Sequence, residues 1–110
     1  MLAYHVTAKR NLRSIRRQGL TPRVPEDYGE NGDTLGVYCF PDIVSAEYAL
    51  SNWLGDRIEE LEDESGKAYD EQVLELDITG LKTKQDAGVE WEIVVEEPVT
   101  PDRILRVFTL

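Results

Sequence analysis

The alternation of apolar and polar positions along the chain predicts five strands. The first covers residues 2–6 and has two faces, with Leu2, Tyr4 and Val6 on one and Ala3, His5 and Thr7 on the other. A continuous apolar run at 36–40, reading GVYCF, predicts a buried strand. Three further strands are expected at 71–79, 89–95 and 103–110.

Two helices are expected between the early strands. An apolar stripe at helical spacing predicts the first over residues 8–18, with Thr7 as its N-cap and Gly19 just beyond its end. The second begins after the N-cap Asp42 and is expected to end near Gly55. Its core stripe consists of Ile43, Ala46, Ala49, Leu50 and Trp53.

Tyr48 falls on the opposite side of this second helix from the core stripe. An aromatic residue in that position is either exposed or turned into a second pocket. The acidic segment 56–65 is expected to continue as a helix and to fray at Ser65. Segment 21–36 is dense in Pro, Gly, Asp and Asn and is too long for a simple connection, so we expect a lid or a binding loop.

The predicted order is strand, helix, strand, helix and then three strands, which is typical of an α+β fold. The length of 110 residues matches a single domain spanning 1–110. In the 89–95 strand, alternation places Glu90 and Glu92 together on one face. The opposite face carries Val89, Trp91, Ile93 and Val95.

The net charge of −10 argues against a nucleic-acid partner, which requires a basic footprint. Half of the 12 bases nevertheless lie within the first 23 residues, and acids crowd segment 56–66. The ordinary interpretation of both runs is solvated surface. The alternative is association with a partner of complementary charge.

The single cysteine, Cys39, excludes an internal disulfide and a cysteine-based zinc cluster. It lies in the apolar run beside Tyr38, so we expect an inert thiol that is buried on the other side of the sheet. No metal site is predicted. The absence of a signal-like start and of a long apolar stretch favours a cytoplasmic protein without a membrane partner.

No candidate for chemistry is specific when taken singly. His5 is the one histidine, and a lone histidine in a strand is most often structural or a surface residue. A tyrosine such as Tyr38 is usually a core residue, and a glutamate pair such as Glu90 and Glu92 usually marks an exposed edge. Their order along the chain and their sequence context are more informative.

Three segments carry these residues, and they read YHVTAKRNLRSIRRQGLTP, GVYCFPDIVSAEYAL and EWEIVVEEPVTPDRI. In this order they resemble the His, Tyr and Glu motifs of the ADP-ribosyltransferase superfamily, in the form found in diphtheria toxin and poly(ADP-ribose) polymerases. The resemblance spans nearly the whole chain. It implies an α+β fold in which two small sheets, rich in antiparallel pairs, form an NAD cleft with helices on its flanks.

The resemblance also implies a role for each site residue. His5 would hydrogen-bond a ribose hydroxyl of NAD, the backbone of Val6 would hold the nicotinamide amide, and Thr7 would lie near the adenosine ribose. The family usually has glycine where this chain has Val6. On the other segments, the implied nicotinamide contacts are the ring of Tyr38, the ring of Tyr48 and the hydroxyl of Ser45.

Cleavage of the nicotinamide–ribose bond builds a sugar with oxocarbenium character, which a fixed carboxylate stabilises. Glu92 matches the catalytic acid, and Glu90, two residues earlier, matches the residue that guides the acceptor nucleophile. The function implied is a small mono-ADP-ribosyltransferase, a toxin-like effector of a bacterium or phage. It would use NAD as substrate and modify a macromolecule, with protein as the expected acceptor.

Two alternatives stay open. The first is a binding or regulatory protein that keeps the fold without catalysis and acts through its charged surfaces. The second is an enzyme of the same fold that transfers an RNA 2′-phosphate to NAD. That chemistry calls for several basic residues in the cleft, and the later strands offer almost none.

Overall fold

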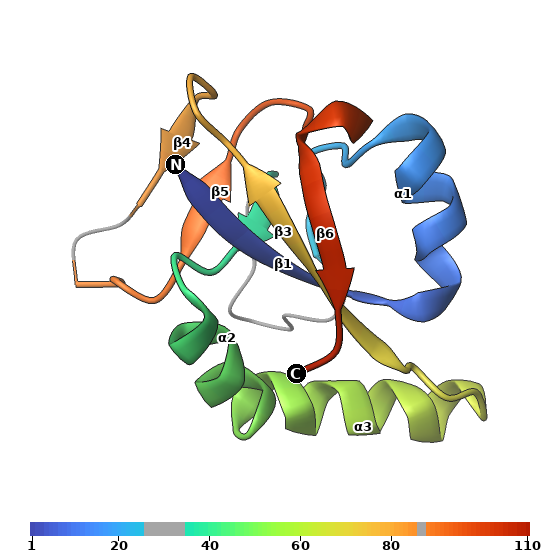
Figure 1. Ribbon diagram of the computed structural model, residues 1–110. Coiled ribbons are helices and arrows are strands. Elements are labelled where there is room, and N and C mark those ends of the chain that lie inside the picture. Colours follow the sequence, from blue (N-terminus) through green and yellow to red (C-terminus); the bar gives the residue numbers. More distant parts are fainter. Residues whose placement is uncertain (26–34, 86–87) are drawn as a thin grey trace.

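Two three-stranded antiparallel sheets are present in the computed structural model, which describes residues 1–25, 35–85 and 88–110 (Figure 1). The first sheet has the order β1-β3-β6, formed by Leu2–Ala8, Glu71–Asp77 and Ile104–Phe108. The second has the order β2-β5-β4, formed by Val37–Cys39, Ile93–Val95 and Thr83–Lys84. The α+β prediction is therefore confirmed, with β4 as a short strand that the sequence pattern did not indicate.

Three α-helices lie within the described ranges: α1 (Leu12–Gln18), α2 (Ile43–Leu50) and α3 (Trp53–Ser65). A 3-10 helix, η1 (Lys9–Asn11), precedes α1, and another, η3 (Pro101–Arg103), precedes β6. In Figure 1, α2 and α3 cover one side of the strands, and α1 lies on another side. Among the described residues, no helix is long and apolar enough to cross a membrane.

The two sheets meet where an edge strand of one approaches an edge strand of the other. Tyr4 of β1 and Phe40, just after β2, form an antiparallel bridge with two backbone hydrogen bonds of 2.9 and 2.7 Å. The strand that carries His5 and the strand that carries Tyr38 therefore lie side by side, although 33 positions separate the two residues.

The strands separate two hydrophobic cores. The first core lies beneath α2 and α3, and the second lies towards α1. Both faces of β1 are buried, with Tyr4 in the first core and Ala3 in the second. In β2, Tyr38 lies in the first core and Cys39 in the second, so the predicted opposite facing of these two residues and the burial of Cys39 are confirmed.

The start of the first helix differs from the prediction. Thr7 is not an N-cap, because β1 continues to Ala8 and Thr7 pairs there with Gln72. The Thr7 hydroxyl oxygen instead accepts a hydrogen bond from Asn11 Nδ2 at 3.2 Å. The end was predicted correctly: Gly19 has a φ of 77°, and its N–H donates to the Ile15 carbonyl oxygen at 2.7 Å.

The second helix does not run on to Gly55. It begins as predicted, because the Asp42 carboxylate accepts the backbone N–H of Ser45 at 2.7 Å, but it ends at Leu50, and α3 starts at Trp53. Gly55 lies inside α3, and a Cβ atom there would be 1.9 Å from the Leu50 carbonyl oxygen. The glycine is therefore explained by a close approach of backbone, not by a helix end. The acidic segment continues the helix to Ser65, as predicted.

The 89–95 strand is shorter than predicted. Only Ile93–Val95 pairs as a strand, and residues around Trp91 form a turn. Trp91 packs against the first core, whereas Ile93 lies in the second, so the prediction that they share a face is wrong. Part of the expected lid or binding loop, residues 26–34, lies outside the described residues.

Candidate functional site

The strongest link between predicted site residues joins His5 and Tyr38. His5 Nδ1 lies 2.7 Å from the backbone carbonyl oxygen of Tyr38. A carbonyl oxygen only accepts hydrogen bonds, so Nδ1 carries a proton and donates it to this contact. In the neutral form of the ring, Nε2 would then be the acceptor nitrogen. The contact fixes both the tautomer and the orientation of the imidazole.

The aromatic ring of Tyr38 is not part of this contact. The residue is 3 % exposed and packs in the first core. A ligand could stack on this ring only if neighbouring side chains moved. The implied stacking role of Tyr38 stays a prediction.

Val6 and Thr7 follow His5 in β1 and are both buried. The side chain of Val6 packs in the first core. A valine in place of glycine therefore adds its bulk to the core. Thr7 accepts a hydrogen bond from Asn11, which ties the end of η1 and the start of α1 to β1.

His5 lines a small polar cavity of about 220 Å³ between β1 and α1. Its walls include Asn11, Ser14, Gln18, Thr21 and Arg23. These side chains offer hydrogen-bond donors and acceptors beside the imidazole, as hydroxyl-rich ligands require.

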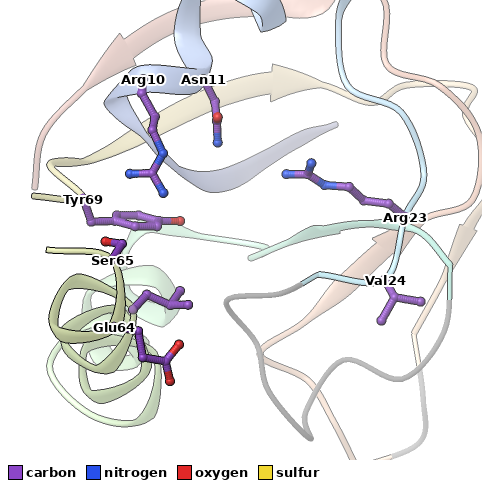
Figure 2. A pocket seen from close by; sticks show the side chains of 8 residues that line it. Arg10, Asn11, Arg23, Val24, Glu64, Ser65 and Tyr69 are labelled. Carbon is purple, nitrogen blue, oxygen red and sulfur yellow. The ribbon is translucent and has the colours of Figure 1, made fainter. Parts of the chain in front are cut away.

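A second cavity of about 350 Å³ adjoins the first, because Asn11 and Arg23 line both. Figure 2 shows the side chains of Arg10 and Arg23 extending towards the space between them. Sequence reasoning missed this cavity. Its only signal in the sequence is the clustering of bases in the first 23 residues, and that pattern by itself indicates a solvated surface or a partner-binding face.

Ser45 and Tyr48 line a third cavity, of about 470 Å³, which is mainly apolar. Trp53 and Trp91 form its aromatic wall, with ring centroids 5.4 Å apart and planes at 58°. Tyr48 is 67 % exposed. Both parts of the prediction for Tyr48 are met, since it is exposed and it also borders a second pocket.

The two glutamates differ in their surroundings. Glu90 is exposed, whereas Glu92 is partly buried and its Oε1 is shielded from solvent. Glu92 directly precedes Ile93, which pairs with Cys39 of β2. The candidate acid is therefore anchored next to the strand that carries Tyr38, and Glu90 is not.

The structure brings the predicted residues into two groups. His5 and Tyr38 are joined directly, and Ser45 and Tyr48 share the aromatic cavity. Among the residues that the structure describes, the His5 cavity and the aromatic cavity have no lining residue in common. Cys39 has no role in either group, and burial raises the pKa of its thiol far above the ordinary value.

Comparison with known proteins gives no assignment. No protein family model matches the chain, and no curated protein matches it. Among the described residues, no group of three or more His, Cys, Asp or Glu side chains is placed to hold a metal ion.

Proposed function

We propose that this protein is a mono-ADP-ribosyltransferase with the ADP-ribosyltransferase fold. It would cleave the nicotinamide–ribose bond of NAD, release nicotinamide and transfer ADP-ribose to a protein. The observation that carries the proposal is the hydrogen bond from His5 Nδ1 to the Tyr38 carbonyl oxygen. It joins two of the three motif residues and holds a defined imidazole tautomer beside a polar cavity.

The arrangement of the strands supports the same proposal. His5 lies on β1, Tyr38 lies on β2, and Glu92 precedes β5, which pairs with β2. The edges of the two sheets meet at Tyr4 and Phe40. His5 and Tyr38 thus lie on neighbouring strands, and Glu92 lies one residue before the strand that pairs with β2.

The chemistry assigns distinct tasks to these residues. His5 would bind a ribose hydroxyl through Nε2, which is the acceptor in the tautomer that the Tyr38 carbonyl selects. Glu92 would stabilise the positive charge that develops on the ribose as nicotinamide leaves. A partly buried carboxylate suits this task, because a low dielectric strengthens its attraction for a cation.

The nicotinamide end has two sets of candidates. Tyr48 and Ser45 border the aromatic cavity, which can accept a flat ring with a polar edge. Tyr38 would have to expose part of its ring on binding, since it is 3 % exposed without ligand. The proposal therefore includes a local rearrangement around Tyr38.

The test is nicotinamide release. The purified protein is incubated with NAD at millimolar concentration, and free nicotinamide is measured by NMR with and without lysate as a source of acceptor. We expect release that rises with lysate and a label from NAD that appears on protein. No release under either condition, together with no NAD binding in calorimetry, would contradict the proposal.

A second candidate is a binding protein without catalysis. The burial of the Tyr38 ring favours it, because the ring is then a core residue and offers no surface to a ligand. In that case NAD and nicotinamide should leave the fluorescence and NMR signals of Tyr38 and its neighbours unchanged. Specific chemical-shift changes there on addition of nicotinamide favour the enzyme.

A further inference from the structure

An arginine-lined cavity adjoins the His5 cavity and is independent of the motif residues. It has a volume of about 350 Å³, which is within the range of small-molecule sites. The residues that line it are Arg10, Asn11, Arg23, Val24, Leu61, Glu64, Ser65 and Tyr69 (Figure 2). Two arginines beside one cavity are notable in a chain with a net charge of −10.

The two arginines are held in place by different contacts. The Arg10 guanidinium lies over the Tyr69 ring, 5.7 Å from its centroid. The Arg23 backbone is fixed by paired hydrogen bonds with Gly36, of 3.0 and 3.1 Å. Across the described part of the chain, neither guanidinium has a carboxylate within ion-pair distance. Within that part of the chain, both guanidinium groups are therefore available to an external anion.

Asn11 lies between the two cavities and adds a third donor. One proton of its Nδ2 donates to Thr7 at 3.2 Å, which leaves the second for a ligand. Guanidinium groups bind phosphate oxygens through pairs of parallel hydrogen bonds, so two of them with an amide suit two linked phosphates.

The opposite wall of the arginine-lined cavity carries hydrogen-bond acceptors and a negative charge. It is formed by the end of α3, where Glu64 and Ser65 offer oxygen acceptors (Figure 2). Glu64 is also 3.9 Å from Arg57 Nη1, so its charge is partly balanced. A ligand that fits both walls carries phosphates at one end and hydroxyl or amino donors at the other, as a nucleoside diphosphate does.

We infer that Arg10, Arg23 and Asn11 bind the pyrophosphate of NAD, with the adenosine half against Glu64 and Ser65. The identity of the substrate rests on the proposed function. The position of the site follows from the shared walls, because a dinucleotide bound at the arginines continues past Asn11 and Arg23 into the cavity that His5 lines.

The experiment is a calorimetric titration with ADP-ribose, inorganic pyrophosphate and adenosine as separate probes. The variant is Arg10→Gln with Arg23→Gln. The matched control is Arg16→Gln with Arg17→Gln, two exposed positions of α1 that line neither cavity and lose the same charge. We expect the affinity for ADP-ribose and pyrophosphate to fall at least tenfold in the variant and less than threefold in the control.

Arg23→Gln alone is a second variant, because Arg10 also covers Tyr69 and its loss can disturb folding. It should weaken ADP-ribose binding while thermal unfolding stays within a few degrees of the parent. Equal losses in the variant and the control would overturn the inference, since they indicate a general charge effect. Failure of the parent to bind either ADP-ribose or pyrophosphate would also overturn it.

The two proposals fail separately. If the parent binds ADP-ribose through the arginines but releases no nicotinamide from NAD, the result supports the pyrophosphate site and contradicts the transferase function. If Arg10→Gln with Arg23→Gln releases nicotinamide with an unchanged KM for NAD, the result supports the transferase function and contradicts the pyrophosphate site.

Discussion

His5 Nδ1 lies 2.7 Å from the backbone carbonyl oxygen of Tyr38, and this contact joins two strands from different sheets. It depends on the main chain at Tyr38 and not on the tyrosine ring. The tyrosine side chain is thus available for core packing while its carbonyl sets the histidine tautomer. Structural and chemical roles of these two residues can therefore be separated by mutation.

Two substitutions at His5 separate the structural role of its contact with Tyr38 from its role in catalysis. Asn reproduces the donor at the Nδ1 position, and Gln places its amide near the Nε2 position. We expect His5→Asn to keep the bond to Tyr38 and lose nicotinamide release. His5→Gln should lose about 1 kcal/mol of unfolding free energy, as is typical for one hydrogen bond. Urea denaturation and NMR detection of nicotinamide measure the two effects; equal stability of both variants would contradict this account.

Much of the fold was predictable because the burial pattern follows strand and helix periods. In β3 and the residue that follows it, Leu74, Leu76 and Ile78 share the second core, as the alternation of a strand at 71–79 requires. Alternation failed at Trp91 because it assumes a strand, and the chain there turns before pairing begins at Ile93. A tertiary contact with Trp53 decides the position of Trp91, and no local pattern records that contact.

The candidate site was predictable in part. The order of His5, Tyr38 and Glu92 can be read from the sequence. His5 and Tyr38 lie on strands as predicted, whereas Glu92 lies just before β5 and not within a strand. The arginine-lined cavity was not predictable, because it joins Arg10 and Arg23 with Tyr69 and the end of α3. Periodicity places a base on a helix face or in a loop, but it does not say which distant segment lies opposite.

Cys39 leads to a prediction about stability at high pH. Burial raises the pKa of its thiol in the folded state, while in the unfolded chain the thiol loses its proton above about pH 8.5. Above that pH the unfolded state binds fewer protons than the folded state, so the free energy of unfolding falls as pH rises. The slope contributed by this one group approaches ~1.4 kcal/mol per pH unit.

Urea denaturation from about pH 7 to about pH 10 measures that slope. Cys39→Ala is the control, and its unfolding free energy should decline less steeply above about pH 8.5. Below that pH, both proteins should show the same dependence, since the thiol is protonated in both states. Identical slopes over the whole range would contradict the assignment of this effect to Cys39.

Gly55→Ala should destabilise the protein although alanine is the better helix former. Inside a helix the exchange ordinarily gains up to ~1 kcal/mol. Here the new Cβ atom would meet the Leu50 carbonyl oxygen at 1.9 Å, so α3 has to move away from the end of α2. We expect a net loss of about 1 to 3 kcal/mol, as for an overpacked site.

Glu59→Ala is the matched control for this change, because Glu59 is an exposed residue of the same helix. Its unfolding free energy should lie within about 0.5 kcal/mol of the parent. Denaturant titrations of both variants and the parent measure these unfolding free energies. A Gly55→Ala protein that is more stable than the parent would show that the close approach of α3 to Leu50 is relaxed in solution.

The last prediction separates the two glutamates near β5. Glu92→Gln keeps the size of the side chain and removes the charge, so NAD should still bind through the residues around His5. The developing cation loses its carboxylate, and nicotinamide release should fall by about 10² or more, equivalent to about 2.7 kcal/mol of barrier. Glu90 is exposed, so Glu90→Gln should leave NAD hydrolysis intact and weaken transfer to the protein acceptor.

Both variants are measured beside the parent in two assays, nicotinamide release by NMR and labelling of acceptor from NAD. Calorimetry with NAD provides the control for binding, because a catalytic loss is meaningful only when the substrate still binds. Release from Glu92→Gln at the parental rate would exclude Glu92 as the catalytic acid. Loss of release in Glu90→Gln alone would exchange the two roles, and the turn before β5 would then have to rearrange when NAD binds, because Glu90 is exposed in that turn.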